Sequence, residues 1–233
     1  MPRAFRTSTK LKLAYLAIAA TDAALAGSSR PMAHRVRVLT KPLLMPALAG
    51  SLATSPRAAG SPLRTSTLVA QAFGWGGDVA LLRHGTSAFA AGTGSFGVGH
   101  AAYISGFARH RAPAGSLLGA TTPRIIAGLW AALTPPVAVG ALRQDPRLGG
   151  AVIGYTGLLA AMAATSSRLN PELPASARRL TLAGAVLFMV SDGILGLRKF
   201  VLKNPPARLE TAVMATYTAS QFLLSEGAAR ASS

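Results

Sequence analysis

Three aspartates stand inside long apolar runs of the chain, where carboxylates are rare. They are Asp22, Asp78 and Asp192. A carboxylate at the centre of a bilayer costs about 2.5–3.5 kcal/mol, so each should face a partner, water or the interior of a helix bundle. A carboxylic acid that keeps its proton can act as a general acid, and an ionised one can act as a base or stabilise a cation. We therefore expect intramembrane acid–base chemistry. A structural hydrogen bond is the alternative, above all for Asp22 near the end of its run.

Polar, small and aromatic side chains accompany two of these aspartates at helical spacing. Gln71, Gly74 and Asp78 are separated by three and four residues, and Gly184, Phe188 and Asp192 by four, which places each set on one helix face. Each set could be ordinary helix packing. Together they predict a polar interior, to which other segments contribute Phe89, Gly92, Phe96, Gly99, His100, Tyr103, Tyr217 and Gln221.

Lys41 lies near the start of a segment that contains two prolines, Pro42 and Pro46. A lysine at this position can bind a phosphate group or extend its ammonium to the membrane surface. Because proline removes a backbone hydrogen bond, the two prolines predict an interrupted helix.

The composition predicts which kind of protein positions these residues. The chain has 233 residues, of which 50% are hydrophobic and 13% charged, and its mean hydropathy is +0.38. Soluble domains carry about 25% charged residues. The net charge of +17 could indicate nucleic-acid binding, but the basic residues punctuate the apolar runs instead of gathering in one stretch. We expect them to flank membrane segments.

Eight apolar segments are bounded by charge, proline or glycine, and we predict an all-α bundle of about eight transmembrane helices in a single domain, 1–233. A cleaved signal peptide over residues 1–27 is the alternative to a retained first helix. The expected helices are 11–27, 38–54, 65–83, 86–107, 123–142, 149–166, 178–197 and 211–226.

Several other site types are excluded or weakened. There is no cysteine, hence no disulfide framework or thiolate site. The GxGxxG pattern at 92–97 lies in an apolar segment without the strand that a nucleotide fingerprint needs, and no GxSxG elbow occurs. A histidine-rich zinc site cannot form, because only His100 lies well inside a segment. A mixed site of His100 and aspartate stays an alternative to our expectation of no metal and no cofactor.

In its order of motifs the sequence resembles the YhhN family, from Lys41 to Gln221. The run 74–77 is more glycine-rich than the family pattern and the loops are richer in arginine, which leaves the substrate range open. The resemblance is carried by Lys41-Pro42-Leu43-Leu44-Met45-Pro46, Gly77-Asp78, Leu81-Leu82, Phe89, Gly92, Phe96, Gly99-His100, Tyr103, Tyr155, Met162, the run from Gly184 to Asp192, Tyr217 and Gln221.

The resemblance implies a lysoplasmalogenase, which hydrolyses the vinyl-ether bond of alkenyl-glycerophosphoethanolamine or -choline to a fatty aldehyde and a glycerophospho-alcohol. It implies that Asp78 and Asp192 are catalytic. Protonation of carbon gives an oxocarbenium ion that water captures, so one protonated and one ionised carboxylate suffice. We expect Asp192 to donate the proton and Asp78 to act as base, although the roles could be exchanged. Lys41 should contact phosphate; the expected orienting residues are His100, Tyr103, Tyr155, Tyr217 and Gln221.

The expected partners are the lysophospholipid substrate and membrane lipids in a multi-pass protein of the cell membrane, without nucleic acid; the oligomeric state stays open. A proton-coupled transporter or lipid-translocating protein is the main alternative, with the same aspartates as proton relays. Helices broken at matching places in two halves would favour it. A non-catalytic membrane scaffold is a third possibility.

Overall fold

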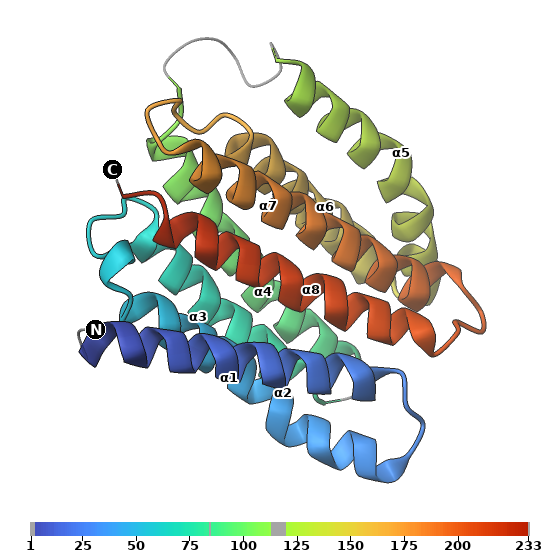
Figure 1. Ribbon diagram of the computed structural model, residues 1–233. Coiled ribbons are helices and arrows are strands. Elements are labelled where there is room, and N and C mark those ends of the chain that lie inside the picture. Colours follow the sequence, from blue (N-terminus) through green and yellow to red (C-terminus); the bar gives the residue numbers. More distant parts are fainter. Residues whose placement is uncertain (1–2, 84, 113–119, 233) are drawn as a thin grey trace.

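The computed structural model describes residues 3–83, 85–112 and 120–232, which form eight α-helices and no strand (Figure 1), so the predicted all-α fold is confirmed. Helix α1 begins at Arg3 instead of residue 11, because the helix continues into its basic flank. The helices are α1 (Arg3–Ala26), α2 (Pro31–Ala53), α3 (Arg64–Ala80), α4 (Thr86–Arg109), α5 (Thr121–Gln144), α6 (Pro146–Ser166), α7 (Ala175–Gly196) and α8 (Arg208–Ala229), with a 3-10 turn at Pro56–Ala58 and a π-helical turn at Leu197–Val201.

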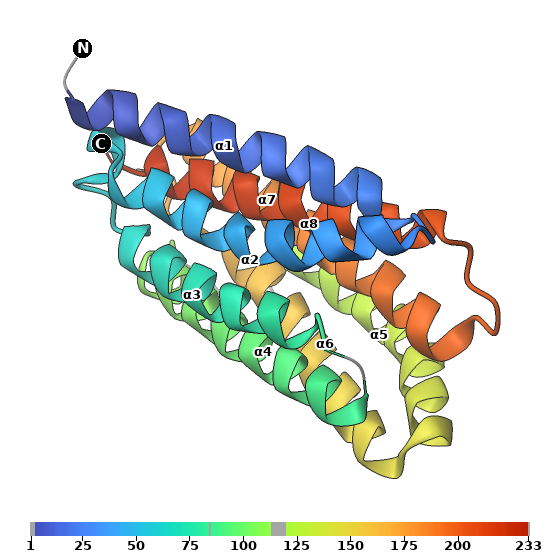
Figure 2. The same ribbon diagram turned by 90° about the horizontal axis from the view of Figure 1, so that it is seen from below.

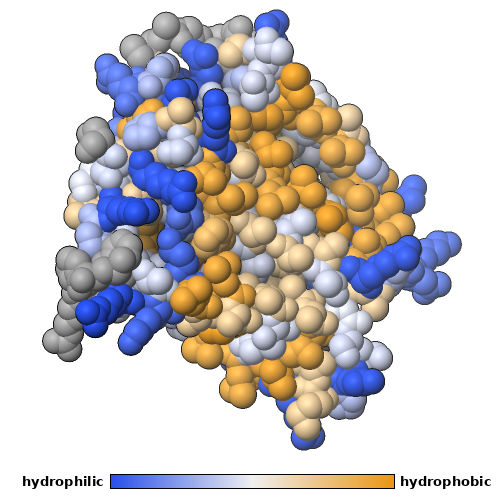
Figure 3. All heavy atoms as spheres, in the orientation of Figure 1, coloured by the Kyte–Doolittle hydropathy of each residue, from blue (hydrophilic) through white to orange (hydrophobic). Residues whose placement is uncertain are grey.

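Within the described part of the chain, three helical stretches are long and apolar enough to cross a membrane: Thr121–Gln144, Pro146–Ser166 and Ala175–Val201. Helix α3 has only 17 residues, and α1 carries Arg6, Lys10 and Lys12. That all eight helices cross the membrane therefore stays a prediction. Figure 3 shows a band of hydrophobic side chains between hydrophilic ones at the two ends of the bundle, as expected for a protein that exposes its middle to lipid.

Seven of the helices close a ring. Each of α1, α2, α3, α4, α6, α7 and α8 packs against the next, and α8 returns to α1. Helix α8 also contacts α2 and α3, so it lies deepest in the bundle. Helix α5 packs mainly on α6 and the π-helical turn, and Figures 1 and 2 show it at the edge of the molecule. The interior of the ring is where polar side chains can be shielded from lipid.

Small residues let the helices approach closely, as expected when packing in lipid relies on dispersion. A Cβ atom on Gly184 of α7 would lie 2.9 Å from the backbone oxygen of Ser220 in α8. A Cβ on Gly77 of α3 would lie 2.5 Å from Cε2 of Phe96 in α4. Both glycines are required by close contacts between neighbouring helices.

The prolines do not break the helices that contain them. The expected interruption of the second segment is wrong, because α2 is continuous from Pro31 to Ala53 with Pro42 and Pro46 inside it. Helix α5 likewise contains Pro135 and Pro136. These pairs lie in non-corresponding helices of the two four-helix halves, so they do not supply the matched breaks that a transporter built from repeats would favour.

Candidate active site

The first carboxylate centre is built around Asp78, near the end of α3. Its side chain is buried at 1% exposure. Tyr217 of α8 donates a hydrogen bond to Oδ2 at 2.8 Å, and the Lys41 ammonium of α2 lies 3.8 Å from Oδ1. Lys41 is itself buried. A buried carboxylate is thus matched by one cation and one hydroxyl donor, which is how a protein accommodates charge away from water.

A buried polar column continues from this centre along the bundle. Tyr103 of α4 donates a hydrogen bond to Oε1 of Gln221 in α8 at 3.0 Å. Gln71 of α3 is fully buried, and neither polar atom of its side chain has a hydrogen-bond partner among the described residues. Polar atoms in such a position are usually satisfied by water. The column therefore has the chemistry to hold the water that a hydrolysis consumes.

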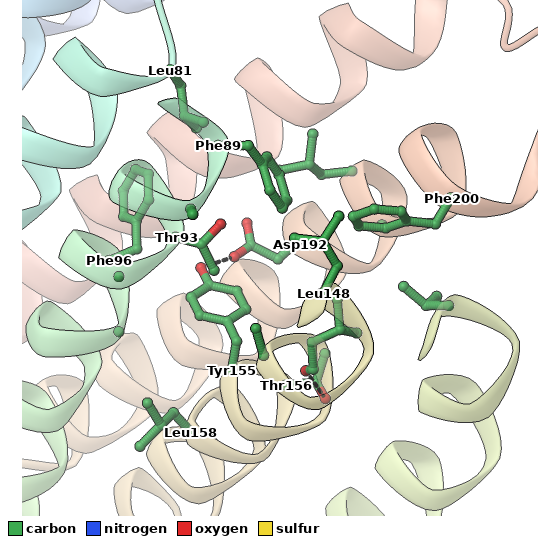
Figure 4. Close-up of a pocket in the computed structure, with 18 of the residues that line it drawn as sticks. Leu81, Phe89, Thr93, Phe96, Leu148, Tyr155, Thr156, Leu158, Asp192 and Phe200 are labelled. Atoms are coloured by element: carbon green, nitrogen blue, oxygen red, sulfur yellow. Dashed lines mark hydrogen bonds between the residues drawn. The ribbon is translucent and has the colours of Figure 1, made fainter. Parts of the chain in front are cut away.

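The second carboxylate centre is Asp192 of α7. Tyr155 of α6 donates a short hydrogen bond to its Oδ2, and the two side chains point toward each other in Figure 4. The Tyr155 hydroxyl also lies 3.2 Å from Nε2 of His100 in α4. His100 is buried, and its Nδ1 has no hydrogen-bond partner in the described structure. Three helices thus position one carboxylate, one hydroxyl and one imidazole in a row.

Aromatic rings connect the two centres. Phe188 of α7 packs edge-on against His100, with ring centroids 4.7 Å apart, and against Tyr217 at 5.5 Å. Phe96 contacts both Phe188 and Tyr217. Among the described residues, Asp78 and Asp192 have no hydrogen-bond donor in common. Each has its own tyrosine donor, and a wall of aromatic side chains lies between the two tyrosines.

Asp192 faces a cavity of about 530 Å³ between α4, α5, α6 and α7. Apart from Asp192, Tyr155 and two threonines, side chains of the lining are apolar, among them Phe89, Phe96, Leu148 and Phe200 (Figure 4). An alkyl chain can enter such a volume without leaving polar groups unpaired.

A second cavity, of about 470 Å³, lies at the end of the bundle where α1 is connected to α2 and α7 to α8. Lys41 is part of its lining, as are Arg37, Arg198 and Glu210. Arg37 and Arg198 both pair with Glu210, and Arg37 also lies 3.5 Å from Oδ2 of the fully buried Asp22. Thr40 donates a hydrogen bond to Asp22 at 2.7 Å. Asp22 is therefore part of an ion-pair network.

Each residue predicted for the site lies in one of these groups. Lys41 and Tyr217 contact Asp78, His100 and Tyr155 form a row with Asp192, and Tyr103 and Gln221 bind each other. Arg37, Arg198 and Glu210 were not predicted as site residues from the sequence. The signal that points to them is Asp22, because a carboxylate inside an apolar run needs a cation nearby.

A metal centre is not indicated by the arrangement of possible ligands. Among the described residues, no three histidine, aspartate or glutamate side chains lie close enough together to hold a metal ion. His100 therefore lacks the further protein ligands of these types that the alternative mixed site requires.

Comparison with known proteins gives one result that covers most of the chain. The sequence model of the YhhN family matches residues 36–228. This range contains both carboxylate centres with Lys41, Tyr217, Tyr155 and His100. No curated protein and no solved structure matches the chain.

Proposed function

Because the chain belongs to the YhhN family, we propose that it is a membrane-bound hydrolase that cleaves the vinyl-ether bond of lysoplasmalogens. The products are a fatty aldehyde and a glycerophospho-alcohol. The observation that carries the proposal is Asp192, a carboxylate held by Tyr155 at the wall of an apolar cavity. We further propose that the protein resides in the cell membrane, where its amphiphilic substrate is concentrated.

The apolar cavity accounts for the first chemical step. The alkenyl chain would occupy the cavity, with its double bond beside Asp192. Proton transfer from the Asp192 carboxyl group to the outer vinyl carbon forms a C–H bond and leaves an oxocarbenium ion on the carbon attached to oxygen. Tyr155, by donating to Oδ2, would hold the carboxyl group in place and stabilise the carboxylate that the transfer creates.

The second step requires water. A water molecule adds to the oxocarbenium carbon and loses a proton, and the resulting hemiacetal collapses to aldehyde and alcohol, so that one water is consumed for each bond cleaved. We assign the charge-stabilising and basic role to Asp78, since the Lys41 ammonium beside it favours its ionised form. The column of Gln71, Tyr103 and Gln221 would supply and orient the water.

A transporter that uses the same aspartates as proton relays remains the competing function. It predicts proton-coupled flux and no aldehyde. The continuous helices α2 and α5 give it no support, and the two cavities with opposite character suit an amphiphilic substrate better than a small ion.

The test is aldehyde release from lysoplasmenylethanolamine by the purified, detergent-solubilised protein. Asp192→Asn should abolish release while leaving the protein folded, because Asp192 makes no ion pair with the described residues. Glu172→Gln, which neutralises a carboxylate in an exposed loop, is the matched control and should retain full activity. A chelator should have no effect. Full activity in Asp192→Asn would refute the mechanism, and inactive but folded wild-type protein would favour transport.

A further inference from the structure

The second cavity has an excess of positive charge. Among the described residues of its lining, five are lysine or arginine and Glu210 is the only carboxylate. They come from α2, from the connection between α3 and α4, and from the π-helical turn after α7. These side chains are Arg37, Lys41, Arg83, Arg198 and Lys199.

The excess remains when the carboxylates behind the lining are included. Asp22 pairs with Arg37, Asp78 pairs with Lys41, and Glu210 pairs with both Arg37 and Arg198. Five cations against three carboxylates leave two positive charges. The remaining acidic residues lie elsewhere: Asp145 caps α6, Glu172 binds Asn170, Asp192 faces the first cavity and Glu226 pairs with Lys12.

We propose that this cavity binds the phosphate ester of an anionic lysolipid, and that the protein selects headgroups of net negative charge over choline and ethanolamine headgroups. An ammonium headgroup needs an available carboxylate or an open aromatic face. Glu210 is already bridged by two arginines, and the Lys199 ammonium lies 4.4 Å from the centroid of the Phe89 ring. Both positions that could attract a cationic headgroup are therefore occupied by the protein's own cations.

The two cavities adjoin, which indicates that one amphiphilic molecule fills both. Leu81, Phe89 and Leu195 line each of them. A chain in the apolar cavity and a phosphate beside Lys41 and Lys199 would put the bond between them near this shared wall. A soluble phosphate could use the same cations, so the chain is what distinguishes a lipid ligand from free phosphate.

The inference rests on the proposed function for its choice of substrate, but its test does not need turnover. Binding of non-hydrolysable alkyl lipids to the purified protein is measured by calorimetry in a nonionic detergent. We expect hexadecyl-glycerophosphate to bind about tenfold more tightly than hexadecyl-glycerophosphocholine, since a charge-assisted contact contributes on the order of one factor of ten in affinity. Glycerophosphate without a chain should bind far more weakly than either lipid.

A pair of double variants tests whether the cavity makes this selection. Arg83→Gln/Lys199→Gln removes two cations of the lining that form no ion pair with the carboxylates of the described residues, and should reduce the preference for phosphate to about twofold or less. Lys203→Gln/Arg208→Gln removes the same two charges from exposed positions at the same end of the bundle, and should keep the preference.

Three results would overturn the inference. They are equal affinity for the two lipids, glycerophosphate binding as tightly as the lipid, and an equal loss of preference in the two double variants. The proposed function can be refuted independently of this inference. If the wild-type protein selects hexadecyl-glycerophosphate but releases no aldehyde from any vinyl ether, the cavity assignment stands and the hydrolase assignment falls. Aldehyde release at the same kcat/KM from both headgroup classes gives the reverse conclusion.

Discussion

Gly77→Ala should destabilise the protein, although alanine is the better helix former. In a helix interior alanine is favoured over glycine by about 1 kcal/mol. The added Cβ would lie 2.5 Å from Cε2, 2.6 Å from Cδ2 and 2.8 Å from Cζ of Phe96. The ring is buried and packs edge-on against Phe188 and Tyr217, so a shift away from the new Cβ would alter both contacts. Such overpacking costs about 1–3 kcal/mol.

Gly128→Ala is the matched control. Gly128 lies in the exposed part of α5, and its Cβ would meet nothing within 4 Å. It gains the same helix propensity without the clash. The two variants should therefore differ in unfolding free energy by about 1–3 kcal/mol, the cost of the clash alone. Denaturant unfolding in detergent, followed by circular dichroism, measures this difference.

Gly77→Ala should also impair catalysis. A displaced Phe96 pushes on Tyr217, whose hydroxyl holds Asp78, and a misplacement of about 1 Å in an active site costs up to about 100-fold in rate. We expect aldehyde release to fall at least about tenfold in Gly77→Ala and to stay unchanged in Gly128→Ala. If Gly77→Ala is as stable and as active as Gly128→Ala, the aromatic wall does not position the tyrosine as we infer.

Three further predictions follow from individual contacts. Asp78→Asn strands the buried Lys41 ammonium and should destabilise the protein by about 3–5 kcal/mol; adding Lys41→Met should recover part of this loss, and additive effects in denaturant unfolding would refute the pairing. Tyr155→Phe removes the donor to Asp192, so kcat for aldehyde release should fall about 10- to 100-fold in a folded protein; unchanged kcat would contradict the assigned role. Glu210→Gln removes the carboxylate that pairs with Arg37 and Arg198 in the basic cavity and should tighten binding of hexadecyl-glycerophosphate, which calorimetry would show; weaker binding would count against the cavity assignment.

The sequence predicted the helices well because the solvent imposes them. In lipid every backbone group must be bonded within its own segment, so apolar runs punctuated by charge indicate helices. What the pattern could not resolve is how far each helix continues beyond its apolar run, as in α1, or whether α2 tolerates Pro42 and Pro46. The ends of a helix and its tolerance of proline depend on local packing and hydrogen bonding, which the length of an apolar run does not reveal.

The site residues were predictable one at a time, but their grouping was not. Spacing places Gly184, Phe188 and Asp192 on one face of α7, and says nothing of which helix that face meets. The structure pairs Asp192 with Tyr155 of α6 and Asp78 with Tyr217 of α8. The first pairing follows from the ring order of the helices, in which α5 lies outside and α6 packs beside α7, whereas the second crosses the ring, because α8 also contacts α3.

The different neighbours of the two carboxylates explain how one bundle can carry two roles. Asp78 has a cation and a hydroxyl donor beside it, and lies behind the basic cavity. Asp192 has a hydroxyl donor and, on its other side, an apolar cavity. In the proposed mechanism, environments that differ in this way would hold Asp78 as the anion and Asp192 as the acid. An amphiphile laid across both cavities would meet the acid at its chain and the anion toward its headgroup, which is the order that protonation followed by hydration of a vinyl ether requires.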